Sequence, residues 1–148
     1  WFRYLRDITL GSTKYDELMV HLMSDNNYNV EDVISTLWMT EDHVKSLRNN
    51  GHIIGLHSYS HPTMIHTLNK EQQEEEYRRN YNHLTQTLGE KVTAMSHPCG
   101  NYNSDTLSIL RKLGIKIGFR SSMSTTKIES NLEIPREDHT NVFKEMTQ

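Results

Sequence analysis

The feature that most constrains the fold of this 148-residue chain is an alternation of short apolar segments with longer helical patterns. Three segments of strand type cover residues 52–57, 92–96 and 115–119, and each lies next to a glycine or a turn. Between them lie two helical patterns, at 70–88 and 104–113. An order of strand, helix, strand, helix, strand is typical of a parallel α/β sheet or barrel.

Local signals define the ends of these helices and add further elements. Asn69 and Ser104 are typical N-cap residues for the two longer helices, and the charged stretch Lys70–Arg79 is interpreted as a solvated helix face. Ser12 is a suitable N-cap for an amphipathic helix over residues 12–25. Four more elements are expected: short helices from Glu31 to about Ser35 and from Thr40 to the stop at Gly51, a last helix over 141–147, and a fourth strand over Leu132–Pro135.

Composition excludes several classes of protein. The net charge is −3 without a basic block, which argues against a nucleic-acid partner, and no apolar run is long enough for a transmembrane segment. The single cysteine, Cys99, excludes an internal disulfide and every multi-cysteine zinc module. A single cysteine is compatible with a cytoplasmic or an external location, so the compartment stays open, with the cytoplasm favoured. Nine histidines are many for this length and point to metal or acid–base chemistry.

The most informative motif is His57-Ser58-Tyr59-Ser60-His61-Pro62. His57 closes a predicted strand, and His61 follows four residues later in a loop, at the end of a parallel strand where sites assemble in α/β folds. Two neutral imidazoles can fill two positions of a zinc site, which usually has a third protein ligand and a water. The alternative is a pair of ordinary loop histidines that bond to the backbone.

Two further motifs also follow predicted strands. The tight turn Pro98-Cys99-Gly100 presents backbone N–H groups that can stabilise an oxyanion, although it could equally be a simple turn capped by Asn103 or Ser104. In the segment from Ile134, His139 could act as a general acid and Arg136 could orient a carboxylate. The alternative for that segment is a surface loop near the C-terminus. Neither serine beside His57 lies in a G-x-S-x-G elbow, which disfavours a serine hydrolase.

Taken in order, these motifs resemble the polysaccharide deacetylase family, also known as carbohydrate esterase family 4 or the chitooligosaccharide deacetylase homology domain. The resemblance runs from Leu37 to Phe143. Its main carriers are Gly51-His52-Ile53-Ile54-Gly55-Leu56-His57-Ser58-Tyr59-Ser60-His61-Pro62, then Pro98-Cys99-Gly100, then Leu113-Gly114-Ile115.

The resemblance implies a distorted (β/α) barrel that acts as a metal-dependent hydrolase on N-acetylated sugars, often in a polysaccharide. His57 and His61 would bind a divalent metal, typically zinc, and Ser58 would hold their loop by hydrogen bonding. The backbone amide of Cys99 would bind the oxyanion. The residues assigned to substrate binding are Tyr59, Pro98 and Gly100.

The chain departs from the family pattern in three places. It has no Asp-Asp pair, which in the family ends the opening strand and supplies the general base and third metal ligand. Residues 1–36 look like a helical insertion, and 37–148 like a partial barrel that lacks the first one or two strands. Ser96 stands where many members have arginine, so Arg136 is assigned the task of orienting the catalytic aspartate. Late in its sequence the family has a Leu-x-His motif whose histidine supplies the general acid. His139 is the nearest match to it here, and His97 is a poorer match.

Three functional hypotheses follow. The first is a metal-dependent carbohydrate de-N-acetylase as the complete protein, with this chain alone inactive. The second is a non-catalytic sugar-binding or interaction relative on the same scaffold, and the third is a different metal hydrolase on a related barrel. A carbohydrate is the expected partner, and the oligomeric state stays open.

Overall fold

The computed structural model describes residues 1–124 and 127–147, which form two compact units divided after Thr40. Among the described residues, no helix is both long enough and apolar enough to cross a bilayer. The first unit, residues 1–40, consists of helices joined by loops, and none of its helices contains a buried residue. Its elements are α1 (Phe2–Tyr4), the π-helix η1 (Leu5–Leu10), α2 (Ser12–Asp25) and α3 (Glu31–Leu37).

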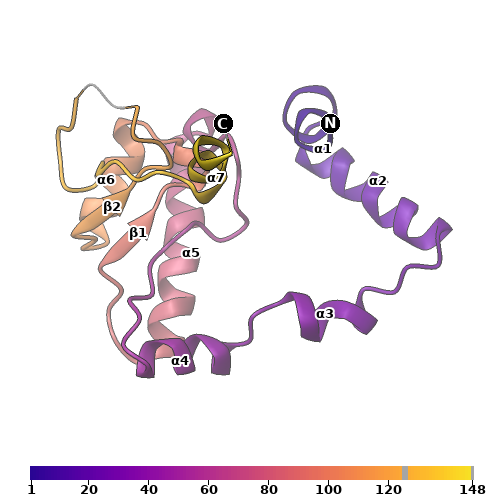
Figure 1. The fold of residues 1–148 in the computed structure, drawn as a ribbon, viewed down its shortest axis with the longest axis horizontal. Helices are drawn as coiled ribbons and strands as arrows, with labels where there is room; N and C mark the ends of the chain where they lie inside the picture. Colours follow the sequence, from indigo (N-terminus) through magenta and orange to yellow (C-terminus); the bar gives the residue numbers. More distant parts are fainter. Residues whose placement is uncertain (125–126, 148) are drawn as a thin grey trace. The chain divides into compact units, whose positions relative to one another are not determined.

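The second unit, from Glu41 onward, mixes helices with a small parallel sheet (Figure 1). Its helices are α4 (Glu41–Asn49), η2 (Ile65–Thr67), α5 (Lys70–Leu88), η3 (Pro98–Gly100), α6 (Ser104–Lys112) and α7 (His139–Met146). Its strands are β1 (Ala94–Ser96) and β2 (Ile117–Phe119). The predicted alternation holds for β1, α6 and β2, whereas the segments predicted as strands over 52–57 and Leu132–Pro135 contribute one isolated bridge each.

The sheet contains fewer strands than predicted, and each strand is shorter than predicted. β1 pairs with β2 in parallel, with Met95 opposite Gly118, and single parallel bridges add Leu56 beside Met95 and Ile134 beside Phe119. The described residues thus give a mixed α/β fold with four parallel segments in the order 56, β1, β2, 134, and they do not close a barrel.

The strand predicted over residues 52–57 is wrong in length. Only Leu56 pairs with β1, accepting from the Ser96 amide and donating to the Ala94 carbonyl. The His52 amide instead bonds back to Leu47 at the end of α4, and the Ile53 side chain is 82% exposed. A segment that pairs on one side over so few residues does not build a ladder.

Helix ends follow the expected capping chemistry with two corrections. Asn69 and Gln72 form a reciprocal capping box at the start of α5, and Gly89 ends the helix in the left-handed conformation, as predicted. At α6 the N-cap is Asn103 rather than Ser104, and its side chain accepts from the Thr106 amide. At α2 the N-cap position belongs to Gly11, because Ser12 is already helical.

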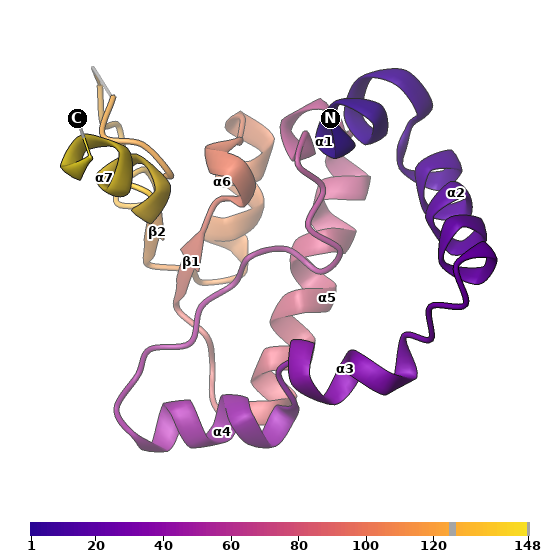
Figure 2. The same ribbon diagram turned by 45° about the vertical axis from the view of Figure 1, so that its right-hand side comes forward.

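The core lies between α5, α6 and the parallel segments. α5 and α6 lie side by side (Figure 2). Gly118 on β2 is required by packing, because a Cβ there would sit 2.6 Å from the Leu132 carbonyl oxygen. The buried apolar residues of the cluster are Leu56, Ile65, Tyr77, Leu84, Val92, Met95, Ile109, Leu110, Ile115 and Leu132.

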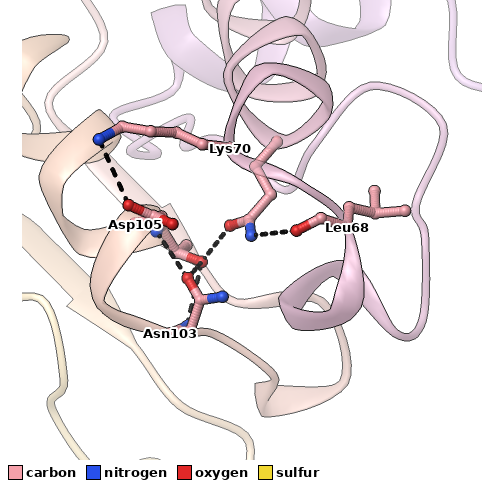
Figure 3. Close-up of polar contacts among 6 residues, drawn as sticks. Leu68, Lys70, Asn103 and Asp105 are labelled. Carbon is pink, nitrogen blue, oxygen red and sulfur yellow. Dashed lines mark hydrogen bonds and ion pairs between the residues drawn. The ribbon is translucent and has the colours of Figure 1, made fainter.

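A buried polar junction joins α5 to α6 (Figure 3). The Thr106 hydroxyl donates to the Gln73 side-chain oxygen at 2.5 Å, and the Gln73 amide donates to the Leu68 carbonyl at 2.9 Å. Lys70 and Asp105 form an ion pair beside it, with 3.3 Å between Nζ and Oδ1. Since Gln73 and Thr106 are fully buried, these bonds fix the two helices relative to each other.

Candidate active site

The candidate site lies along the edge of the sheet that is formed by the carboxyl ends of the parallel segments. The bridges at Leu56 and Ile134 are parallel to β1 and β2, so the residues that follow all four segments share that edge. The residues that follow are His57, the turn at Pro98–Gly100, Arg120 and Arg136. The histidine motif and the Pro-Cys-Gly turn therefore lie at the same end of the sheet.

His57 is held in a defined orientation at this edge. Its Nδ1 lies 2.8 Å from the Ser96 carbonyl oxygen, so this nitrogen carries the proton and donates. Its backbone amide donates to the Asn80 side-chain oxygen at 3.0 Å. The ring is exposed to solvent, and the tautomer leaves the Nε2 lone pair available to a ligand. A hydrogen bond from the other ring nitrogen to a carbonyl is what metal-binding histidines usually show.

The His61 ring lies next to the His57 ring. Their centroids are 4.8 Å apart, and the ring planes are tilted by 53°. His61 has a left-handed backbone, with φ of 57°. Two imidazoles in this arrangement fit two positions of a zinc site. Within residues 1–124 and 127–147, no group of three or more His, Cys, Asp or Glu residues could hold a metal, so this pair is not completed there.

The loop between the two histidines is held by α5. The Glu76 carboxylate accepts from the Tyr59 amide at 3.0 Å and from the Ser60 amide and hydroxyl, both at 2.8 Å. Ser58, which has φ of 63°, was expected to hold this loop. In the described structure its buried hydroxyl has no hydrogen-bond partner, so Glu76 takes that part.

Tyr59 stands half exposed at the rim of the histidine loop. The Arg79 guanidinium from α5 lies 3.9 Å above its ring centroid, which is within cation–π range. One face of the ring is therefore covered by α5. An exposed tyrosine ring fixed in this way is a suitable platform for a sugar, and its assignment to substrate binding stays a prediction.

The second loop, Pro98–Gly100, forms a tight turn. Cys99 is left-handed, with φ of 53° and ψ of 16°, and the Gly100 amide donates back to the His97 carbonyl at 3.0 Å. Gly100 has φ of 72°, and a Cβ there would collide with the Ser121 hydroxyl. The Asn101 side chain donates to the Thr63 carbonyl at 2.7 Å, which ties this turn to the histidine loop.

His97 lies inside the protein rather than in the open site. It is 1% exposed, its Nε2 donates to the Leu132 carbonyl at 2.7 Å, and its ring stacks on Tyr102 with centroids 4.4 Å apart. Burial lowers the pKa of His97, so the ring is neutral near pH 7. Tyr102 in turn donates to the buried Glu133 at 3.0 Å, and burial together with that carboxylate raises the pKa of Tyr102. This stack joins the residues on either side of the Pro98–Gly100 turn and so supports that turn.

Arg136 and His139 follow the Ile134 bridge. The Arg136 Nε donates to the Arg120 carbonyl at 3.1 Å, which links the ends of two neighbouring parallel segments. His139 is the first residue of α7, its side chain is 94% exposed, and its Nδ1 lies 3.2 Å from Asp138. The catalytic roles assigned to both residues stay predictions.

The profile of the polysaccharide deacetylase family matches residues 14–118. The chain therefore belongs to the polysaccharide deacetylase family, as its ordered motifs indicated. The match begins inside the segment predicted to be an insertion and ends before Arg136 and His139. No curated protein matches.

Solved structures with the same fold include three bacterial proteins. The deacetylase PplD from Streptococcus pyogenes, solved with acetate, is 22% identical with a TM-score of 0.61, and the match covers 78% of this chain and 54% of that one. The BpsB deacetylase domain from Bordetella bronchiseptica is 15% identical, with a TM-score of 0.59 and coverage of 68% and 48%. IcaB from Ammonifex degensii is 21% identical, with a TM-score of 0.57 and coverage of 66% and 46%. The chain thus spans about half the length of these structures.

Proposed function

We propose that the complete protein is a metal-dependent hydrolase that removes N-acetyl groups from an amino sugar or a polysaccharide. Membership of the polysaccharide deacetylase family supports de-N-acetylation in general. The observation that carries the metal dependence is the pair of adjacent imidazoles, His57 and His61, at the end of a parallel segment. The carbonyl of Ser96 fixes the His57 tautomer that a metal requires.

In this proposal His57 and His61 supply two neutral nitrogen ligands to a divalent metal, typically zinc, which imidazoles commonly bind. When bound, such a metal polarises the acetamide carbonyl and lowers the pKa of a water. Since no group of three or more His, Cys, Asp or Glu residues that could hold a metal occurs in the described residues, we place the further ligands and the general base elsewhere in the complete protein. This chain alone is accordingly proposed to be inactive.

The remaining site residues are given roles around the reacting acetamide. The Cys99 backbone amide, in its left-handed turn, is proposed to donate to the oxyanion, which would be a fixed backbone donor needing no reorganisation. Tyr59, Pro98 and Gly100 are proposed to contact the sugar. His139 is proposed as the general acid, and Arg136 as the residue that orients the catalytic carboxylate.

The test is His57→Ala in the full-length protein, with His52→Ala as the control. His52 is an exposed histidine five residues earlier in the same segment, so it matches the loss of an imidazole. We expect His57→Ala to lose bound zinc, measured by elemental analysis, and to lose acetate release from N-acetylated amino-sugar oligomers. His52→Ala should retain both. Full activity in His57→Ala would overturn the proposal.

A second candidate function is a non-catalytic sugar-binding or interaction relative on the same scaffold. The observation that favours it is the pair of histidines without a third metal ligand in the described part of the chain. Metal content separates the two candidates. Stoichiometric zinc in the purified full-length protein supports the enzyme, whereas metal-free protein that still binds oligosaccharide supports the relative.

A further inference from the structure

The structure assigns Glu76 a role that no motif of the family resemblance contained: we infer that it is a positioning residue for the histidine pair. This inference rests on the proposed function, in which His57 and His61 hold the metal. Glu76 lies on α5 and contacts the two residues immediately before His61 rather than the imidazoles. It therefore acts through the loop that carries the proposed ligands.

The bonding around Glu76 uses both carboxylate oxygens. Oε2 accepts from two successive backbone amides, those of Tyr59 and Ser60, and Oε1 accepts from the Ser60 hydroxyl. Hydrogen bonds to an ionised carboxylate are stronger than those between neutral groups. Two adjacent amides that point to one oxygen fix the direction of the backbone just before His61.

Asn80, one turn later on the same face of α5, completes this anchorage. Its side-chain oxygen accepts from the His57 amide at 3.0 Å, so α5 bonds to the loop at residues 57, 59 and 60. The loop itself needs such support because both Ser58 and His61 have left-handed backbones. A non-glycine residue in that region is held there by its surroundings.

α5 is a rigid reference for this loop. Its first turn is closed by the Asn69 capping box, its last turn by Gly89, and Gln73 and Tyr77 on the same side are fully buried. A shift of Glu76 relative to the core would break these contacts. The loop that carries the two imidazoles is thus held by a helix anchored in the core, through one carboxylate and one amide.

The experiment compares Glu76→Gln and Glu76→Ala with Glu75→Gln in the full-length protein. Gln keeps the shape of Glu76 without its charge, and Ala favours the helix while removing the three bonds from residue 76 to the loop and leaving that of Asn80. Glu75 is exposed and carries the same charge one residue earlier, where its carboxylate lies 3.8 Å from Arg79. Zinc affinity is measured by competition with a chromophoric chelator. Amide hydrogen exchange at Tyr59 and Ser60 is measured in the metal-free protein, together with its thermal unfolding.

We expect Glu76→Ala to weaken zinc binding by about 10- to 100-fold, the range seen when a residue that orients metal ligands is removed, and Glu76→Gln by about tenfold. Exchange at Tyr59 and Ser60 should accelerate in both, while thermal unfolding of Glu76→Gln stays close to that of Glu75→Gln. Glu75→Gln should bind zinc like the unchanged protein.

Each other outcome has a distinct meaning. If the unchanged protein binds zinc and Glu76→Gln and Glu76→Ala bind it equally well, the inference is wrong and the proposed function stands. If Glu76→Ala does not fold, the result for Glu76→Gln decides. If the unchanged protein binds no zinc, the proposed function fails, and the inference fails with it.

Discussion

At the scale of single residues, hydrogen bonds to backbone carbonyls fix the orientation of the histidine rings at and beside the site. His57 and His97 illustrate two opposite uses of an imidazole at the same end of the sheet. His57 is exposed, with Nδ1 bonded to the Ser96 carbonyl and Nε2 available to a ligand. His97 is buried, with Nε2 bonded to Leu132 and Nδ1 lacking any partner in the described structure. Only the first can exchange a ligand, whereas the second stabilises the fold as long as it stays neutral.

This difference makes a prediction about pH. Burial lowers the pKa of His97 in the folded protein below the unfolded value of about 6.5, so the unfolded state binds more protons at acidic pH. The free energy of unfolding should therefore fall as the pH drops through about 6.5, with a contribution of at most about 1.4 kcal/mol per pH unit from this residue. Urea unfolding at pH 7 and pH 5 measures it.

His97→Gln should reduce the number of protons taken up on unfolding by up to one, so the free energy of unfolding should depend less on pH. His139→Gln is the matched control, because the His139 side chain is 94% exposed and the substitution also removes one imidazole. An unchanged slope in His97→Gln would show that His97 takes up a proton in the folded state as readily as in the unfolded state.

At the scale of elements, α5 and α6 are the framework on which the site is built. α5 holds the histidine loop through Glu76 and Asn80, and the buried junction of Gln73 with Thr106 fixes α5 to α6. The loop before α6 contains Asn103, whose side chain also donates to the His66 carbonyl at 2.9 Å. The two loops of the site are thus attached to one pair of helices.

Thr106→Val should destabilise the protein by about 1–3 kcal/mol, because it leaves the buried Gln73 oxygen without a donor. Thr85→Val is the control: the Thr85 hydroxyl is buried without a partner in the described structure, so its loss should cost little or stabilise. Urea denaturation of both variants tests this. Equal destabilisation by the two substitutions would contradict the role given to the junction.

The helices were predictable because their signals are local. The bounds of α2 and α5 agree with the predicted ranges, since side-chain spacing and the residues Asn69 and Gly89 determine where a helix begins and ends. Strand length was not predictable, because it depends on partners distant in sequence. The apolar run 52–57 therefore contributes only Leu56 to the sheet.

The candidate site was predictable in part for the same reason. The histidine pair and the Pro98–Gly100 turn stand out in the sequence, and the structure places both at the same edge. Glu76 did not stand out, because it lies in a charged stretch with Glu74 and Glu75 that resembles a solvated face. Its spacing of three residues from Gln73 and four from Asn80, on one side of the helix, was the available signal.

At the scale of the whole molecule, the sheet of the second unit has an open side. In the described part of the chain, the segment at Leu56 pairs only with β1, so its other side carries no strand. Unpaired sheet edges bind other edges. Exposed apolar side chains lie close to this edge along the chain, with Ile53 at 82% exposure.

We therefore expect the 148-residue chain, expressed by itself, to self-associate or to unfold without a sharp transition. Light scattering after size exclusion and a thermal melt measure both properties. Ile53→Lys should reduce the association, because a charge beside an open edge disfavours strand pairing, whereas Lys91→Arg, which leaves the charge unchanged, should not. A monomer with a sharp, cooperative melt would contradict this expectation.

The left-handed residues of the site have a consequence for protein engineering. Of the four non-glycine residues with positive φ in the described chain, Ser58, His61 and Cys99 all lie in the two site loops. Glycine adopts this conformation without steric cost, so a screen for thermostable variants will tend to select it at positions 58 and 99. Such variants would give the loops a freedom that the present side chains deny them. At these two positions, a substitution that raises thermal stability would therefore loosen the geometry of the proposed site.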